Sequence, residues 1–192
     1  HIRAGGVIAI PIENSYVFAA DAFNRSAVES LHLIRDDPDE QAASVMVPSI
    51  ISVRGLTASL SEEALMLAEG FWPGKLFLQL KANRSLTWDL GDGGVLNQFM
   101  VRVPNNDFAL ALLKETGPLA VASAGLSGRP ALREPGEINE VFGSVIHLIC
   151  DDGALDLALG STVVDATAFP HRIVREGEVT NTQLRALCPT LV

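Results

Sequence analysis

Short apolar runs rich in β-branched residues alternate along the chain with stretches in which apolar residues recur every three or four positions. The short runs are typical of strands. The strands expected from this pattern are 7–10, 44–47, 76–80, 100–103, 119–123, 145–149, 162–164 and 172–174. Several of these runs are apolar throughout, which indicates a sheet that is covered on both faces.

The stretches with helical spacing predict helices over 27–34, 61–70, 107–115 and 137–142, and Thr180 and Pro189 bracket a final short helix. Boundary residues agree with these helices. The residues in question are Ser59 and Glu62 at capping-box spacing, Asn106 and Asp107 as N-caps, and Gly117 and Gly143 where helix ends favour a left-handed residue. No repeat or linker-like stretch divides the chain, and Gly91–Gly94 is typical of a loop tip. We therefore expect one mixed α/β domain over residues 1–192.

Composition and charge narrow the class of partners. The 192 residues are 48% hydrophobic and 19% charged, which suffices for one sizeable core. The formal net charge of -9 repels phosphate backbones and acidic membrane surfaces, so any contact with nucleic acid requires a local basic patch.

The cysteines and the N-terminal region favour a cytoplasmic protein. Cys150 and Cys188 lie far apart without histidines at metal-ligand spacing, so we interpret them as free thiols. The apolar stretch 7–10 is interrupted by Pro11 and Glu13, which makes it too short to span a bilayer and unlike a signal peptide. The sequence begins at His1 rather than Met, so the position of the native N-terminus stays open.

Several common chemical motifs are not intact. The segment Gly70–Lys75 has one residue too few between its glycines for a phosphate loop, and Leu76 stands where Ser or Thr would reach magnesium. The fingerprints G-x-G-x-x-G and G-x-S-x-G are absent. The acidic run 36–40 could gather a divalent cation, but it lacks the spacing of a calcium loop, and we interpret it as a solvated loop. We predict no resident metal.

Small polar and cationic residues gather at the expected strand ends. They are Asn14–Tyr16, Arg102, Ser123–Gly128, Ser161, Thr162 and Arg175. Open α/β sheets form ligand crevices at strand ends, where Arg forks bind carboxylates or phosphates. These residues alone indicate an anionic small-molecule site.

Taken in order along the chain, the sequence motifs resemble those of the YrdC-type threonylcarbamoyl-AMP synthase family from end to end. Several matches in the same order over nearly the whole chain are specific. The segments that carry the resemblance are 5–11, Tyr16 with 19–24, Phe71–Gly74, Val101–Pro104, Ser123–Gly128, Ser161–Asp165 and Arg175–Gly177. The resemblance implies a twisted mixed sheet flanked by helices around a concave cavity. It also implies a nucleotidyltransferase that joins threonine, bicarbonate and ATP, with Mg²⁺, into threonylcarbamoyl-AMP and pyrophosphate.

The resemblance also implies roles for individual residues. Arg35 and Ser123 would be catalytic; Arg102, Ser123, Ser127 and Arg175 would hold the nucleotide; Asn14, Tyr16, Ser161 and Thr162 would line the threonine end. A partner enzyme would then transfer the threonylcarbamoyl group to a tRNA adenosine, and family members are also described as RNA-binding proteins.

Several positions depart from the family pattern. Its Lys-x-Arg pair and following Lys read Arg35, Asp37 and Gln41, and its Ser-x-Asn reads Ser123-Ala124-Gly125. The Thr of its tryptophan motif is replaced by Phe77. One unit-charge contact at about 4 Å is worth roughly 1 kcal/mol in water and about 4 at an effective dielectric of 20, so an acid at position 37 opposes a triphosphate. Two functions therefore stay open: an active synthase, and a paralogue that binds a nucleotide, RNA or a protein partner without turnover.

Overall fold

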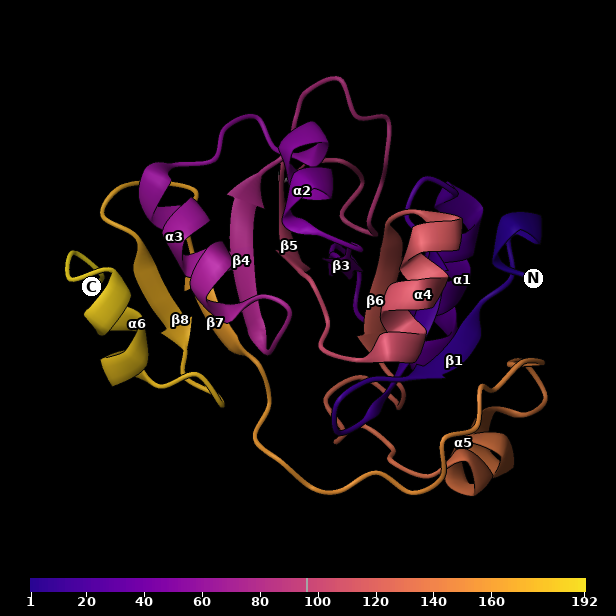
Figure 1. Ribbon diagram of the computed structural model, residues 1–192. Coiled ribbons are helices and arrows are strands. Elements are labelled where there is room, and N and C mark those ends of the chain that lie inside the picture. The colour runs from indigo at the N-terminus through magenta and orange to yellow at the C-terminus, as the bar shows by residue number, and fades with distance from the viewer. Residues whose placement is uncertain (96) are drawn as a thin grey trace.

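The strands of the computed structural model, which describes residues 1–95 and 97–192, form one mixed sheet in the order β1-β2-β6-β3-β5-β4-β7-β8 (Figure 1). The strands are β1 (Ile8–Pro11), β2 (Tyr16–Asp21), β3 (Ser44–Met46), β4 (Leu76–Lys81), β5 (Gln98–Arg102), β6 (Leu119–Ser123), β7 (Thr162–Asp165) and β8 (Arg172–Arg175). Strands β3 and β5 are parallel, as are β4 and β7, and the other neighbours are antiparallel.

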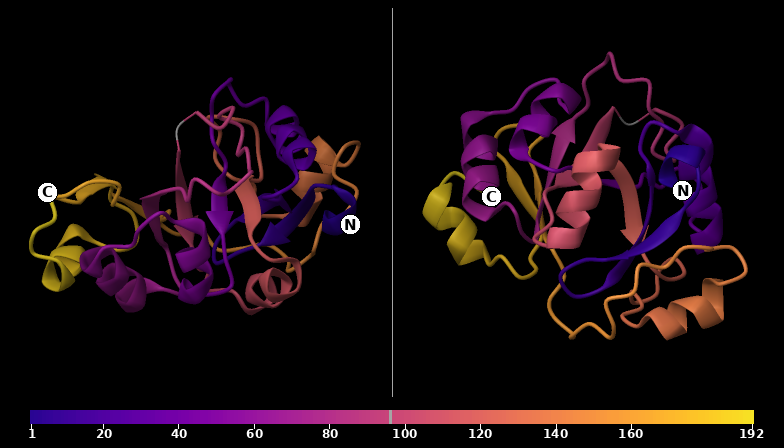
Figure 2. Two further views of the ribbon diagram at one scale, coloured as in Figure 1. Left: turned by 90° about the horizontal axis from the view of Figure 1, so that it is seen from above. Right: turned by 45° about the vertical axis from the view of Figure 1, so that its right-hand side comes forward.

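The helices pack against two different parts of this sheet. They are α1 (Arg25–Arg35), α2 (Ile50–Leu56), α3 (Glu62–Phe71), α4 (Asp107–Thr116), α5 (Pro135–Phe142) and α6 (Asn181–Leu187), and a 3₁₀ turn spans Ile2–Ala4. Strands β1, β2 and β6 are covered by α4 on one face and by α1 and α5 on the other. In the views of Figure 2, α1 and α4 lie on opposite sides of these strands.

The other part of the sheet is covered on one face only. Helices α2, α3 and α6 contribute to the same hydrophobic cluster as β3, β4, β5 and β7. Because successive side chains of a strand point to opposite faces, Leu76, Leu78 and Leu80 enter this cluster, whereas Phe77 between them lines a cavity. The same alternation places Phe99 and Val101 in the core and leaves Arg102 in the cavity wall. The uncovered face becomes the floor of the cavity.

The expected mixed α/β fold is confirmed, but the prediction of a strand at 145–149 is wrong. Only Ile149 of that segment forms a bridge, with Ala9 of β1, and Val145 and Leu148 are substantially exposed. The segment touches the edge of the sheet too briefly to form a ladder.

Two elements were missed. Strand β2 continues the apolar run from Tyr16 to Ala20, and it pairs with β1 in a hairpin whose register joins Pro11 to Tyr16. Helix α2 spans only 7 residues, too few for a clear three-to-four repeat, and Ser49 at its N-cap makes no side-chain hydrogen bond.

The cap predictions were partly right. Asn106 caps α4, and Thr180 opens α6 with a complete capping box. Helix α3, however, is capped by Ser61 rather than Ser59, because the Ser61 hydroxyl accepts the N–H of Ala64 at 3.0 Å. Gly143 ends α5 in a right-handed conformation with φ -60°, so it is not the left-handed residue that was expected. Among the described helices, none combines the length and apolar character needed to cross a bilayer.

The division of β4 into a core face and a cavity face gives a stability prediction. We expect Leu78→Ala, which empties a fully buried position, to lower the free energy of unfolding by about 2–5 kcal/mol. The adjacent Phe77→Ala should cost less although it removes more atoms, because Phe77 borders the cavity rather than the core. Urea denaturation of both variants measures the difference, and equal losses would contradict this assignment of faces.

Candidate functional site

The open face of the sheet forms the floor of a cavity of about 1150 Å³. Ser44, Met46, Phe77 and Met100 contribute to the floor from three neighbouring strands. Two irregular segments, 129–133 and 157–161, form further parts of the wall. The second belongs to the long connection from α5 to β7, which runs along the lower edge of the molecule in Figure 1.

The fold brings most of the residues predicted from the sequence to this one cavity. Those that line it are Asn14, Arg35, Arg102, Ser123, Ser161 and Arg175. Tyr16, Ser127 and Thr162 are not among the lining residues. A site assembled from the ends of several strands agrees with the expectation for an open α/β sheet.

The three predicted residues outside the lining have structural partners. The Tyr16 hydroxyl donates to the carbonyl of Gly153 and accepts the N–H of Asp152, both at 2.9 Å. Thr162 is buried, and its hydroxyl donates to the Val179 carbonyl at 2.6 Å. The Ser127 N–H donates to the carbonyl of Arg35 at 2.8 Å. These contacts hold loops around the cavity, and the predicted ligand roles of the three residues stay predictions.

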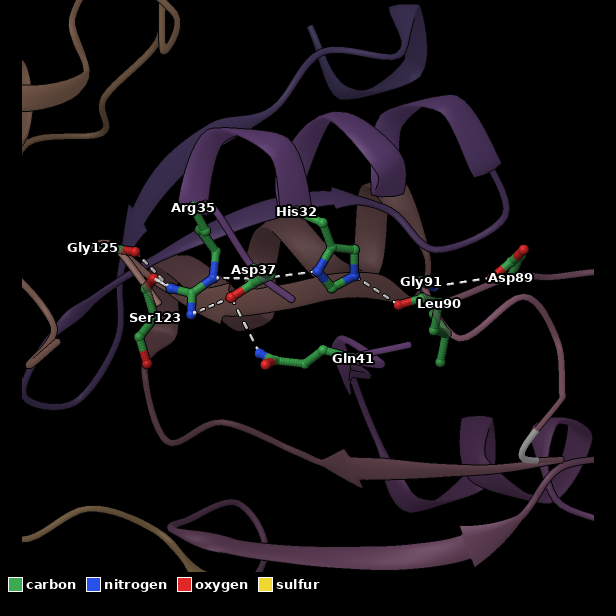
Figure 3. Close-up of polar contacts among 9 residues, drawn as sticks. All are labelled: His32, Arg35, Asp37, Gln41, Asp89, Leu90, Gly91, Ser123 and Gly125. Atoms are coloured by element: carbon green, nitrogen blue, oxygen red, sulfur yellow. Dashed lines mark hydrogen bonds and ion pairs between the residues drawn. The ribbon is translucent and has the colours of Figure 1, made fainter. Parts of the chain in front are cut away.

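Arg35 lies at the centre of a buried polar network, drawn in Figure 3. Its Nε donates to Asp37 Oδ2 at 2.9 Å and its Nη2 to Asp37 Oδ1 at 3.1 Å, so the two side chains form a bidentate ion pair. Its Nη1 donates to the carbonyls of Ser123 and Gly125, the latter at 2.8 Å. A guanidinium has five N–H donors, so at most one of them is left for a ligand.

The end of α1 places Asp37 in this position. Asp36 adopts a left-handed conformation with φ 54°, which Asp tolerates better than most residues. The chain then turns back, and the Asp37 N–H donates to the carbonyl of His32 at 3.1 Å. The Asp37 side chain is fully buried, so the interpretation of the acidic run as a solvated loop is wrong for this residue.

His32 and Gln41 complete the contacts of the Asp37 carboxylate. His32 Nδ1 lies 2.9 Å from Asp37 Oδ2, and Gln41 Nε2 donates to Oδ1 at 3.2 Å. His32 Nε2 lies 2.8 Å from the carbonyl of Leu90. Gly91 has φ 105°, and a Cβ there would collide with the His32 ring, so the network requires glycine at this position.

The hydrogen bonds around Asp37 decide its ionisation. Burial alone would raise the pKa of Asp37, but hydrogen bonds from Arg35, Ser127 and His32, together with the charge of Arg35, outweigh burial and hold this pKa below its ordinary value. The carboxylate and the guanidinium are therefore both charged, and they neutralise each other at the cavity wall.

Arg102 is a second buried cation with a carboxylate partner. Its Nη1 and Nη2 donate to Glu13 Oε1 and Oε2 at 2.6 and 2.9 Å, and its guanidinium carbon lies 5.3 Å from the centre of the Phe77 ring. Burial would raise the pKa of Glu13, but Arg102 and the N–H of Asn105 lower it below the ordinary value. The buried Nε of Arg102 has no hydrogen-bond partner among the described residues.

Other polar groups of the wall are available to a ligand. The hydroxyls of Ser123 and Ser161 make no hydrogen bond within the described part of the chain. Arg175 is exposed, and among the described residues it donates only to the carbonyl of Ser161, at 3.0 and 3.2 Å. These groups offer neutral donors and one unneutralised positive charge.

The sequence analysis missed four residues of the site: Glu13, His32, Arg129 and Arg133. Arg129 and Arg133 follow directly after the Ser123–Gly128 motif, and this proximity was a signal that could have found them. Glu13 and His32 reach the site only through contacts between distant segments, which spacing does not reveal.

The structure also bears on the phosphate loop and the metal site that the sequence analysis rejected. Lys75, the last residue of the Gly70–Lys75 segment, is buried and bonds to Glu178 at 2.5 Å and to the carbonyl of Leu159 at 3.3 Å. Residues 1–95 and 97–192 contain no group of three His, Cys, Asp or Glu side chains placed to hold a metal ion. The described residues therefore offer no ready-made cage for Mg²⁺.

Comparison with known proteins identifies similar chains. The Sua5_yciO_yrdC family model, described as "Telomere recombination", matches residues 1–177. A Mycobacterium tuberculosis protein named "Putative threonylcarbamoyl-AMP synthase" is 34% identical over 183 residues, covering 95% of this chain and 83% of the relative.

Two solved structures are also similar. The structure of P. abyssi Sua5 complexed with L-threonine has a TM-score of 0.91 and 29% identity, covering 100% of this chain and 56% of that one. E. coli YciO has a TM-score of 0.84 and 27% identity, covering 95% and 88%. The chain thus spans a little over half the length of the P. abyssi protein.

The Arg35–Asp37 pair gives a second stability prediction. Asp37→Asn keeps the shape of the side chain but leaves a buried guanidinium without its counter-charge, and we expect a loss of about 3 kcal/mol in the free energy of unfolding. The double variant Arg35→Ala/Asp37→Ala removes both charges. Its loss in the free energy of unfolding should be smaller than the sum of the losses in Arg35→Ala and Asp37→Ala. Urea denaturation tests this; strictly additive losses would show that the two charges do not interact.

The pKa of Asp37 gives a prediction about pH. A carboxyl whose pKa is lowered by folding adds stability above its unfolded pKa, about 3.9, and this stability is lost as pH falls through the folded pKa. The stability difference between wild type and Asp37→Asn should therefore be constant near neutral pH and shrink below about pH 4. Because each comparison uses the same pH, the acids that do not contact Asp37 cancel. A difference that grows on acidification would contradict the assignment.

Proposed function

Because the chain belongs to the Sua5/YciO/YrdC family, we propose that it is a threonylcarbamoyl-AMP synthase of tRNA threonylcarbamoyladenosine biosynthesis. The proposed reaction joins threonine, bicarbonate and ATP into threonylcarbamoyl-AMP and pyrophosphate. Relatives from Pyrococcus abyssi and Bacillus subtilis, 32% and 30% identical, are named threonylcarbamoyl-AMP synthase.

The observation that carries the proposal is the composition of the cavity. Ser123, Ser161 and Arg175 come from three different strand ends or their flanks, and they present two hydroxyls and a cation to one space of about 1150 Å³. This volume exceeds that of most ligand pockets, about 300–1,000 Å³, so two substrates fit together. The related P. abyssi structure is titled as a complex with L-threonine, and its likeness to this chain supports a threonine end here.

The chemistry requires positioned reactants more than a covalent catalyst. The amine of threonine attacks bicarbonate, and loss of water leaves a carbamate on nitrogen. A carbamate oxygen then forms a bond to the α-phosphorus of ATP while the bond to pyrophosphate breaks. Holding the two substrates together supplies much of the acceleration, and donors aimed at the phosphates stabilise the charge that develops.

The predicted residues take their proposed roles from their position. Ser123 and Arg175 would contact the nucleotide, and Asn14 and Ser161 would contact the threonine end. Asn14 also donates to the carbonyl of Ala158 at 3.3 Å, which holds the 157–161 segment over the cavity. Arg35 would act by fixing the carbonyls of Ser123 and Gly125 rather than by touching substrate.

Mg²⁺ enters the proposal as part of the MgATP substrate. The described residues hold no metal cluster, and Mg²⁺ commonly binds through substrate phosphates and retained water with one or two carboxylates. The product would pass to an enzyme that modifies tRNA. The net charge of -9 disfavours extended contact with the tRNA backbone itself.

A second function is favoured by one observation. Both buried arginines of the wall are neutralised by carboxylates, Asp37 and Glu13, so the buried part of the site attracts a polyphosphate less than two free guanidinium groups would. A protein of this kind could bind a nucleotide or an amino acid without turnover. Turnover and binding have to be measured separately.

The proposal predicts pyrophosphate release that requires threonine, bicarbonate and MgATP together. Arg175→Ala should reduce kcat/KM at least about fivefold, since one charge contact with phosphate is worth roughly 1–4 kcal/mol between water and an effective dielectric of 20. Ser123→Ala should reduce it less, because it removes a neutral hydrogen bond. A coupled pyrophosphate assay measures both variants.

Arg185→Ala is the matched control, because Arg185 is an exposed arginine on α6 that does not line the cavity. Its kcat/KM should equal that of the wild type. MgATP binding without threonine-dependent pyrophosphate release would favour the binding function over the synthase.

A further inference from the structure

The segment 129–133 brings two arginines to the cavity that belong to none of the predicted motifs. Arg129 is exposed, and it makes no ion pair or hydrogen bond with another described residue through its side chain. Arg133 is half-buried, and its only side-chain hydrogen bond within residues 1–95 and 97–192 runs from Nη1 to the carbonyl of Leu155 at 2.8 Å. Neither guanidinium has a carboxylate within ion-pair distance among the residues the structure describes, so both charges are available.

Backbone hydrogen bonds hold this segment beside the end of β6. The N–H of Leu132 donates to the carbonyl of Ala124 at 2.7 Å, and the N–H of Tyr16 donates to the carbonyl of Leu132 at 3.1 Å. The Leu132 backbone therefore bridges the Ala124 region and the start of β2. This attachment holds the backbone between Arg129 and Arg133 in place.

Gly125 permits this close approach. A Cβ at position 125 would lie 3.1 Å from the carbonyl oxygen of Pro130, which is tighter than ordinary van der Waals contact. A larger side chain would have to displace the 130–132 backbone. The glycine that interrupts the Ser-x-Asn pattern is thus linked physically to the presence of the arginine segment in the cavity wall.

The distribution of charge favours this segment as the place for an anion. Arg35 and Arg102 are paired with Asp37 and Glu13, so each pair adds no net charge. The remaining cations of the lining are Arg129, Arg133 and Arg175, and its acids are Glu137 and Glu176. Glu176 already accepts the N–H of Asn181 at 3.1 Å. A ligand with several negative charges is attracted to the unneutralised arginines, and not to the buried pairs.

We propose that Arg129 and Arg133 form the cationic subsite that binds the phosphate chain of the nucleoside triphosphate, in place of Arg35 and Arg102. This inference rests on the proposed function for the identity of the ligand. An arginine fork binds two phosphate oxygens at once, so two such forks together with Arg175 can hold a di- or triphosphate group. Arg35 and Asp37 then shape the wall, and the charge that recognises substrate comes from the segment beside Gly125.

The test measures the affinity of the full chain for MgATP and for inorganic pyrophosphate by calorimetry. Arg129→Ala and Arg133→Ala should each weaken both ligands by about tenfold, the equivalent of roughly 1.4 kcal/mol. The double variant should weaken them further and bind with a smaller dependence on salt, because fewer charges contribute. Arg133→Lys should recover part of the affinity, since it retains the charge.

Two further variants separate this subsite from the buried pairs and from effects on folding. Arg35→Ala/Asp37→Ala removes an ion pair with no net charge, so the dependence of binding on salt should stay that of the wild type, even though loss of the contacts to the Ser123 and Gly125 carbonyls lowers the affinity. Arg133→Ala also removes the hydrogen bond to the carbonyl of Leu155 and so loosens the 151–161 segment. Arg129 makes no hydrogen bond to that segment, so the affinity lost in Arg129→Ala reports the missing charge. Arg185→Ala serves as the control arginine far from the lining.

Each outcome of the binding measurements supports or contradicts the proposed anion subsite. Unchanged affinity in the Arg129 and Arg133 variants, or a smaller salt dependence in the Arg35/Asp37 double variant, would overturn the inference. Wild type that binds pyrophosphate through these arginines but does not bind MgATP would support the anion subsite while rejecting the proposed synthase function. Wild type that binds neither ligand would reject both.

Discussion

A buried guanidinium must have a counter-charge and partners for its N–H groups, and this requirement organises the wall of the cavity. Removing an ion from water costs several kcal/mol unless its partners are well placed. Arg35 satisfies the requirement with Asp37 and with two carbonyls at the end of β6, so a single side chain joins the end of α1 to the strand on which Ser123 lies. His32 extends the connection to the loop at Leu90. The positions of these three segments are therefore mutually dependent.

The cavity itself follows from strand alternation combined with incomplete helix coverage. Helices cover both faces of β1, β2 and β6, but α2, α3 and α6 cover only one face of the other strands. Side chains such as Phe77 and Met100 then border the cavity although their neighbours in sequence are core residues. A site of this kind needs no special loop to create it, and the loops at 129–133 and 157–161 only complete its wall.

The sequence pattern predicted much of the fold because alternating and helical periodicities are local properties. It missed β2, whose apolar run begins at Tyr16 among polar residues that had been interpreted as a strand end. Four of the residues that it predicted for the site line one cavity, namely Asn14, Ser123, Ser161 and Arg175, and their roles there stay predictions. It could not predict that Asp37 turns inward onto Arg35. Burial of the Arg35 charge depends on the carbonyls of Ser123 and Gly125, which lie 88 and 90 positions away in the chain. An acidic run is ordinarily solvated, and only the tertiary contacts overturn that expectation.

The departures from the family pattern gain a common physical interpretation in three dimensions. An acid at position 37 appeared to oppose a phosphate ligand directly, but it faces Arg35 and cancels that charge within the wall. Gly125 lacks the amide of the family pattern, yet its missing side chain leaves room for the Pro130 carbonyl and hence for Arg129 and Arg133. The positive charge that Asp37 neutralises at one part of the wall is thus accompanied by unneutralised arginines at another. For a polyanionic ligand, the total attraction depends on the number of unneutralised cations within roughly a Debye length, about 8 Å at physiological salt, more than on which strand supplies them. A site altered in this way can keep its ligand class while changing how the ligand lies.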